Sequence, residues 1–191
     1  MTKTVGAIIL AAGFSSRFGS VKLNAKLANG MSVVQQTLAN IHYAGLPSVV
    51  ITRPELAAQL QLHNTSIETF TGAAEGMGAS LAFGVSKALD WDACLVCLAD
   101  MPFIESSTYR LIADRLSPAT IVLPCYYTRP GNPVGFGRNF YAQLQALQGD
   151  TGGRAITESN QDAVVELAID DPAILNDIDT PADLARYQLQ E

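Results

Sequence analysis

Small residues, hydroxyl groups and two cations gather in residues 10–23 (LAAGFSSRFGSVKL), with no acidic residue among them. Gly13 can adopt backbone conformations closed to other residues, so the chain can approach a ligand closely there. The Ser15 hydroxyl and the exposed backbone N–H groups of such a turn can bind an anion. Arg17 offers a planar fork of donors that suits phosphate oxygens, and Lys22 offers a mobile point charge. The segment therefore predicts a loop that cradles a triphosphate.

A plain Gly/Ser-rich loop with two solvated cations remains an alternative for the same segment. Two other phosphate-binding loops are disfavoured, because the chain has neither G-x-x-x-x-G-K-[ST] nor G-x-G-x-x-G at this position. These absences argue against a P-loop ATPase and against a dinucleotide-binding Rossmann enzyme.

Asp100 follows directly on an apolar run, 93–98, that is typical of a buried strand. A carboxylate at the end of a buried strand is costly unless it is solvated, paired or bound to a metal. Mg²⁺ prefers oxygen ligands and is commonly held by one or two carboxylates together with substrate phosphates. Asp100 is thus a candidate Mg²⁺ ligand, with a helix-capping or turn role as the alternative. Cys94 and Cys97 on the same strand point to opposite faces, which favours core cysteines over a zinc or redox pair.

A second acidic candidate lies near the end of the chain, in the string NDIDTPADL at 176–184. Asp177 and Asp179 stand two residues apart, so in an extended segment they point the same way and can converge on one cation. Thr180, Pro181 and Asp183 have the types expected of an N-cap and first turn, which makes Asp183 a structural helix-start residue.

Apolar periodicity alternates along the chain between strand-like and helix-like segments. Such alternation predicts an α/β fold with right-handed βαβ units on a mainly parallel sheet. In this architecture ligands bind outside the carboxyl ends of the strands, where the candidates above fall. The predicted strands are 5–10, 48–52, 65–70, 93–98, 119–124 and 163–168. The predicted helices are 31–44, 54–62, 78–89, 106–116, 139–147 and 181–190.

The length of 191 residues is that of one domain, 1–191. No apolar run approaches the roughly 20 residues of a membrane span. The first residues make a poor signal peptide. The three unpaired Cys favour a reducing cytoplasm. A net charge of −6 argues against a general nucleic-acid binder. The charge is uneven, because residues 1–54 carry five Lys or Arg and no acid, whereas residues 139–191 carry ten acids and two Arg. The basic start suggests a region that meets an anion, and most of the late acids are expected on solvated surface.

With these motifs the sequence resembles MobA-like nucleotidyltransferases, nearest to the molybdenum cofactor cytidylyltransferase group. The resemblance rests on LAAG with Arg17 and Lys22, on L-x-D-M-P at Asp100, on the 76–81 string GMGASL, and on D-I-D-T-P-x-D-L. It implies a three-layer Rossmann-like nucleotidyltransferase fold, with Arg17, Lys22 and Asp100 catalytic and Asp100 and Asp179 on Mg²⁺. The nucleotide-binding residues that it implies are Leu10, Ala11, Ala12, Gly13, Ser15, Arg17, Lys22, Gly76, Gly78 and Ser80.

On the acceptor side the resemblance points to Asn132, Asp150, Arg154 and Asp177. The family usually has G-H-P where this chain has Gly-Asn-Pro at 131–133. Asn132 keeps hydrogen-bonding capacity but cannot carry a proton near neutral pH, so the acceptor's identity stays open. Arg154 follows a G-D-x-G loop and is positioned to meet an acceptor phosphate, although a plain turn with a capping Asp150 explains the same string.

The function expected from the resemblance is transfer of CMP from CTP to the terminal phosphate of molybdopterin, with release of pyrophosphate. Ala12 favours CTP, because guanylyltransferase relatives tend to have Gly at this position. A guanylyltransferase or a sugar-phosphate nucleotidyltransferase is the alternative within the class, and a non-catalytic cofactor carrier for a molybdenum hydroxylase is the alternative outside it. The expected partners are the nucleotide, the phosphorylated acceptor and, transiently, a molybdoenzyme, with no nucleic acid and no membrane.

Overall fold

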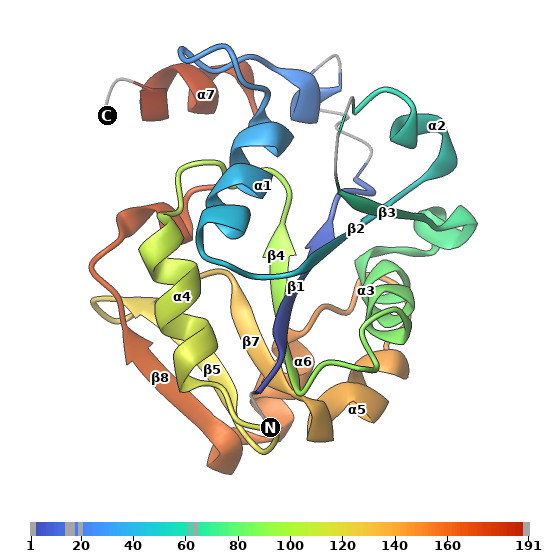
Figure 1. Ribbon diagram of the computed structural model, residues 1–191, viewed down its shortest axis with the longest axis vertical. Coiled ribbons are helices and arrows are strands. Elements are labelled where there is room, and N and C mark those ends of the chain that lie inside the picture. The colour runs from blue at the N-terminus through green and yellow to red at the C-terminus, as the bar shows by residue number, and fades with distance from the viewer. Residues whose placement is uncertain (1–2, 14–17, 19–20, 61, 63–64, 189–191) are drawn as a thin grey trace.

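The protein is a three-layer α/β structure, shown as a computed structural model in Figure 1. The structure describes residues 3–13, 18, 21–60, 62 and 65–188. A twisted sheet forms the middle layer, and helices α1 and α4 cross in front of its strands in Figure 1. The predicted α/β fold with a mainly parallel sheet is thereby confirmed.

Eight described strands form one sheet in the order β3-β2-β1-β4-β7-β5-β6, with β8 paired to β5. Strands β3, β2, β1 and β4 run parallel, as do β5 and β8, whereas β7 is antiparallel to both of its neighbours. The strands are β1 (Val5–Leu10), β2 (Ser48–Thr52), β3 (Ser66–Thr69), β4 (Ala93–Leu98), β5 (Ile121–Tyr126), β6 (Arg129–Pro130), β7 (Val134–Gly137) and β8 (Val164–Ala168).

The central pair β1 and β4 is in register along its whole length and ends with Leu10 beside Leu98. Beyond that pair, the Ala99 N–H donates to the Leu10 carbonyl at 3.1 Å. The chain segments that follow the two strands therefore leave the sheet side by side. This carboxyl edge lies toward the top of Figure 1, where α7 is also found.

The helices fill the two outer layers. Helices α1 and α4 pack on one another, and α3 packs on α5 and against β1 and β2. The α-helices are α1 (Val33–Tyr43), α2 (Pro54–Ala57), α3 (Met77–Ser86), α4 (Ser106–Arg115), α5 (Tyr141–Gln145), α6 (Arg154–Ser159) and α7 (Pro181–Gln188). Short 3-10 helices are η1 (Lys22–Asn24), η2 (Thr71–Glu75), η3 (Arg138–Phe140), η4 (Gln161–Ala163) and η5 (Pro172–Leu175). No helix in the described ranges is long and apolar enough to cross a membrane.

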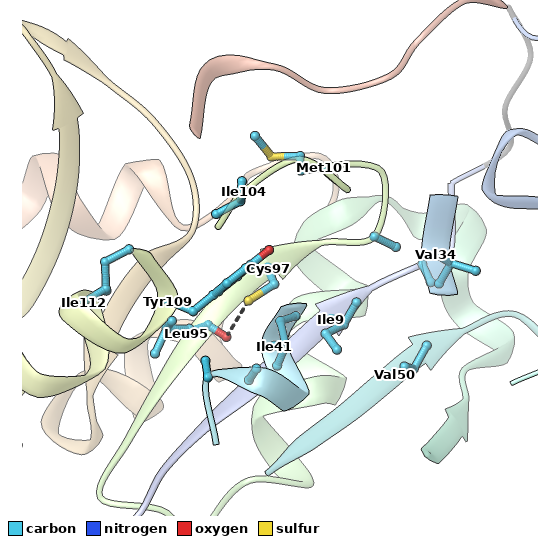
Figure 2. Packing of buried hydrophobic residues seen from close by; sticks show 14 of the residues in the cluster. Ile9, Val34, Ile41, Val50, Leu95, Cys97, Met101, Ile104, Tyr109 and Ile112 are labelled. Atoms are coloured by element: carbon cyan, nitrogen blue, oxygen red, sulfur yellow. Dashed lines mark hydrogen bonds between the residues drawn. The ribbon is translucent and has the colours of Figure 1, made fainter. Parts of the chain in front are cut away.

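Two hydrophobic clusters cover the two faces of the sheet, as expected when helices flank a buried sheet on both sides. Figure 2 shows the cluster under α1 and α4, where Ile41, Tyr109 and Ile112 meet strand residues. Cys97 belongs to this cluster and Cys94 to the one under α3 and α5. Both are free and buried, so the prediction that they are core cysteines is confirmed.

Among the elements that differ from the sequence-based expectation are α2, β7 and α6. The helix predicted over 54–62 ends at Ala57, after which a bond from the Gln59 N–H to the Leu56 carbonyl tightens the chain into a turn. Strand β7 and helix α6 were not predicted. The first contains two glycines in four residues, and the second follows directly on a Gly-Gly pair, which is typical of a turn.

Candidate active site

Two adjoining cavities open at the carboxyl edge of the sheet. The first measures about 560 Å³ and the second about 540 Å³, and they share the walls Leu10, Met77 and Leu98. The first is lined by Leu10, Ala11, Ala12, Gly13, Lys22, Leu23, Ala73, Ala74, Gly76, Met77, Ser80, Leu98, Ala99, Asp100, Asp150 and Asp179. The second is lined by Leu10, Met77, Leu81, Val96, Leu98, Leu123, Pro130, Gly131, Asn132, Val134, Phe136, Gly152, Gly153, Arg154, Thr157, Glu158 and Gln161.

Charged side chains from three separate segments meet in the first cavity. The Lys22 ammonium lies 2.6 Å from Oδ2 of Asp100 and 3.0 Å from Oδ1 of Asp179. One carboxylate oxygen from each of Asp100, Asp177 and Asp179 lies within 4.8 Å of the others. Here we call these three residues the acidic cluster. Its spacing would let all three side chains contact one cation.

The backbone explains how the two acids near the end of the chain reach Asp100. The Ile178 N–H donates to the Asp100 carbonyl at 3.0 Å, and the Ile178 side chain is fully buried. In this extended segment the residues on either side of Ile178 project the other way, into the acidic cluster. The expected convergence of Asp177 and Asp179 is therefore observed. Asp177, assigned from the resemblance to the acceptor, lies with the two predicted metal ligands.

Lys22 and the acids of this cluster shift each other's pKa values. Burial alone would lower the pKa of Lys22, but the charges of Asp100 and Asp179 and the hydrogen bonds to both raise it above its ordinary value. Burial raises the pKa of Asp100, Lys22 partly opposes that rise, and the charge of Asp177 adds to it. Among the described residues, Lys22 thus pairs with acids from two separate segments, and these pairs partly offset the cost of burying Asp100.

The segment after β1 forms one wall of the first cavity. Ala11 and Ala12 are buried, whereas Gly13 is exposed and a Cβ added there would meet no described atom within 4 Å. Open space at Gly13 agrees with a loop that a ligand approaches closely. Ser15 and Arg17, predicted for the triphosphate, lie outside the described residues.

Gly76 and Gly78 lie at the start of α3, and the chain itself accounts for their lack of side chains. Gly76 has a φ of +115°, and a Cβ there would overlap the Gly149 backbone. The Gly78 N–H donates to the Gly149 carbonyl at 2.8 Å, and a Cβ on Gly78 would overlap the Thr151 carbonyl. Because these glycines have no Cβ, the loop that carries Asp150 packs against the start of α3, and Asp150 lines the first cavity. Ser80, also lining this cavity, donates to the Gly76 carbonyl at 3.3 Å.

Asn132 and Arg154 line the second cavity, apart from Asp150. Its walls are mostly aliphatic and aromatic, with polar groups supplied by the loop at Asn132 and by α6. The Arg154 Nε donates to Glu158 at 2.8 Å, and both side chains are exposed. The four predicted acceptor residues thus divide into three places: Asp177 in the acidic cluster, Asp150 in the first cavity, and Asn132 and Arg154 in the second.

Sequence reasoning missed the α6 side chains of the second cavity, Thr157 and Glu158, and Gln161 just beyond the helix. With Arg154 they stand at positions i, i+3, i+4 and i+7, the spacing of one helix face. That spacing is a usable signal, but the preceding glycines favoured a turn.

Comparison with known proteins adds an independent finding. Residues 7–164 match the family described as the MobA-like NTP transferase domain. No curated protein matches the chain. Among solved structures, Rv0371c from Mycobacterium tuberculosis H37Rv is similar over 100% of both chains, with 27% identity and a TM-score of 0.85.

Two further structures are similar in fold. Rv0371c in complex with manganese matches 99% of this chain and 100% of its own, with 24% identity and a TM-score of 0.83. Molybdopterin-guanine dinucleotide biosynthesis protein A from Archaeoglobus fulgidus matches 97% of both chains, with 18% identity and a TM-score of 0.70.

Proposed function

The chain belongs to the MobA-like NTP transferase family, and from that membership and its site we propose that it transfers CMP from CTP to the terminal phosphate of molybdopterin, releasing pyrophosphate. Nucleotidyl transfer is the activity of the family. The nucleotide, the acceptor, the metal and the cytoplasmic setting are the proposed parts. A transient contact with the molybdoenzyme that receives the product belongs to the same proposal.

The proposal rests on one observation: Lys22 contacts two acids of the acidic cluster in a cavity that residues 10–13 line. Nucleotidyl transfer needs positive charge around a triphosphate and an anchor for the metal that accompanies it. Both are available here within one cavity. A protein that only carried a cofactor would have little need of three acids from two distant segments together with Lys22 in one cavity.

The acidic cluster suits a divalent cation in its donor chemistry. Its three carboxylates are hard oxygen donors, the kind preferred by Mg²⁺ and Mn²⁺. The Lys22 ammonium between Asp100 and Asp179 also indicates that positive charge is favoured there. Asp100 and Asp179, with Asp177 beside them, would hold the ion, and a bound Mg²⁺ would supply charge neutralisation for the phosphates.

In the proposed reaction a phosphate oxygen of the acceptor attacks the α-phosphorus of CTP. The new P–O bond forms as the bond to the α–β bridging oxygen breaks, and pyrophosphate leaves with that electron pair. Lys22 would turn from the acids to the phosphate oxygens, and we assign Arg17 to the same negatively charged phosphates. No general base is required, because a phosphate nucleophile is already ionised at pH 7. Catalysis then rests on positioning and charge stabilisation.

The second cavity supports the acceptor side of the proposal. It opens beside the first, so an acceptor held there would present its phosphate across the shared walls Leu10, Met77 and Leu98. The apolar floor suits a flat ring system, and the amide of Asn132 and the guanidinium of Arg154 offer hydrogen bonds to polar edges. The preference for CTP rests on Ala12 in the wall of the first cavity.

The test is pyrophosphate release by purified protein with Mg²⁺, with molybdopterin or a sugar phosphate as acceptor, and with each of CTP, GTP, ATP and UTP in turn. Release with CTP above the other nucleotides is expected, with the D100A variant as the background control. Release with GTP only would make the protein a guanylyltransferase. Release only with sugar phosphates would make it a sugar-phosphate nucleotidyltransferase in place of one that acts on molybdopterin. Tight molybdopterin binding without release from any nucleotide would favour the carrier function.

A further inference from the structure

Asp171 is a buried carboxylate that neither cavity uses. It is 5% exposed, and every other acid that the structure describes is more exposed. Its Oδ2 accepts from the Glu105 N–H at 3.0 Å and from the Thr108 hydroxyl at 2.7 Å, and its Oδ1 accepts from the Ala173 N–H at 3.0 Å. Most of the late acids that the structure describes are exposed, as expected, and Asp171 is the buried exception among them. Because its three hydrogen-bond donors come from two separate segments, Asp171 forms a junction between those segments.

The junction joins two segments that are far apart in sequence. On one side Asp171 caps the N-terminus of α4, whose own N-cap residue Glu105 makes no side-chain capping bond. A negative charge is favoured at that end of a helix. On the other side Asp171 caps η5, and Figure 1 shows the chain between β8 and α7 passing the end of α4.

Each joined segment carries part of the acidic cluster. Asp100 precedes Glu105 by five residues, and Asp177 and Asp179 follow Asp171 by six and eight. The segments meet a second time through the bond from the Ile178 N–H to the Asp100 carbonyl. Both intervening stretches are anchored, because Met101 and Ile104 on one side and Ala173 and Ile174 on the other are buried. A shift at Asp171 would therefore be transmitted to the acids.

We propose that Asp171 is a positioning residue that sets the spacing of Asp100 against Asp177 and Asp179, and thereby the affinity of the acidic cluster for a divalent cation. The inference rests on the proposed function, because that cluster is its metal site. An ionised carboxylate accepts on both oxygens, whereas the amide of Asn accepts on only one. In the Asp171→Asn variant an NH₂ group would replace one of the two oxygens. It would face either the Ala173 N–H, so that η5 would move, or the Glu105 N–H and the Thr108 hydroxyl, so that the start of α4 would move.

The experiment measures Mn²⁺ binding to the nucleotide-free protein by electron paramagnetic resonance, in the wild type and in D171N. Loss of a group hydrogen-bonded directly to a metal ligand typically weakens metal affinity about 10- to 100-fold. Because Asp171 acts on the acidic cluster through the backbone, we expect the Mn²⁺ dissociation constant of D171N to rise by about 10-fold, the lower end of that range. The matched control is K3M. Lys3 donates to the Ala113 and Leu116 carbonyls at 3.0 and 2.7 Å, so it caps the other end of α4. K3M should lower the melting temperature and leave Mn²⁺ affinity unchanged.

A lower melting temperature of D171N with wild-type Mn²⁺ affinity would make Asp171 merely structural and overturn the inference. If D171N does not fold, T108V removes one of the three bonds and should weaken Mn²⁺ binding in the same direction; wild-type affinity in T108V would count against it equally. Absence of Mn²⁺ binding by the wild type would instead overturn the metal assignment of the proposed function, and this inference with it.

Discussion

At the scale of single residues, Lys22 is the side chain whose surroundings say most about the site. Its ammonium contacts oxygens of Asp100 and Asp179, two of the three acids that would hold a divalent cation. The same lysine is assigned to the phosphates once a nucleotide is present. A bound metal would therefore compete with the lysine for the same carboxylates, and in the proposed function a triphosphate would give the lysine another partner.

Lys22→Met should increase the Mn²⁺ affinity of the nucleotide-free protein and decrease pyrophosphate release. The substitution removes a competing positive charge that neutralises two ligand carboxylates, and it also removes a charge from the phosphates. Both quantities can be measured on one preparation, by Mn²⁺ titration and by a pyrophosphate assay.

The matched variant is Asp100→Asn, which keeps the size of the side chain and removes its charge. Mn²⁺ affinity should change in the opposite direction from that of K22M, because a carboxylate ligand is lost. Equal or parallel changes in the two variants would contradict the competition between lysine and metal.

At the scale of elements, the start of α3 is held by a loop from the far half of the chain. Gly76→Ala should lower the free energy of unfolding by about 1–3 kcal/mol, because its φ of +115° and the Gly149 backbone both oppose a Cβ. Urea denaturation measures the change. Gly13→Ala is the control, since a Cβ there meets no described atom, and its stability should stay within about 0.5 kcal/mol of the wild type. Equal free energies of unfolding for G76A and the wild type would contradict this prediction and show that the loop at Gly149 can move to accommodate a Cβ.

The elements that the sequence predicts well are those whose own residues decide them. Strands β2 and β4 match the predicted bounds, because Val, Ile and Leu runs of this length are typical of strands covered on both faces. Strand β7 lacks such a run, and its pairing between β4 and β5 depends on residues about 10 to 40 positions away. The sheet order could not be predicted for the same reason, since it is decided by long-range pairing.

The same division holds for the site. Local spacing predicted that Asp177 and Asp179 would converge, because alternation in an extended segment is a property of the backbone. It could not show that Asp171 is buried, since its donors Glu105 and Thr108 come from another part of the chain. Nor could it separate Asp150 from Asn132, because the loop at Gly149 is placed by the start of α3.

At the scale of the whole molecule, the two faces of the sheet each bury a thiol of β4. Burial raises the pKa of Cys94 to about 12, and burial raises the pKa of Cys97 well above its ordinary value. Both thiols stay protonated in the folded protein at pH values where an unfolded chain would lose those protons.

The free energy of unfolding should therefore fall as the pH rises above about 8.5, the ordinary pKa of cysteine. Above that value the unfolded state binds fewer protons than the folded state, so stability decreases with pH, by about 1–2 kcal/mol per thiol between pH 8 and 10. Urea denaturation at several pH values measures the slope. A C94A/C97A variant should show a shallower decline, and an identical slope in that variant would assign the pH effect to other groups.

The two adjoining cavities draw on different stretches of the chain. The walls of the first come mainly from residues 10–100, whereas the walls that belong to the second alone come mainly from residues 123–161. Among the residues that the structure describes, only Leu10, Met77 and Leu98 line both. With the nucleotide in the first cavity and the acceptor in the second, as proposed, substitutions confined to the second would change the acceptor and leave the walls of the nucleotide cavity as they are.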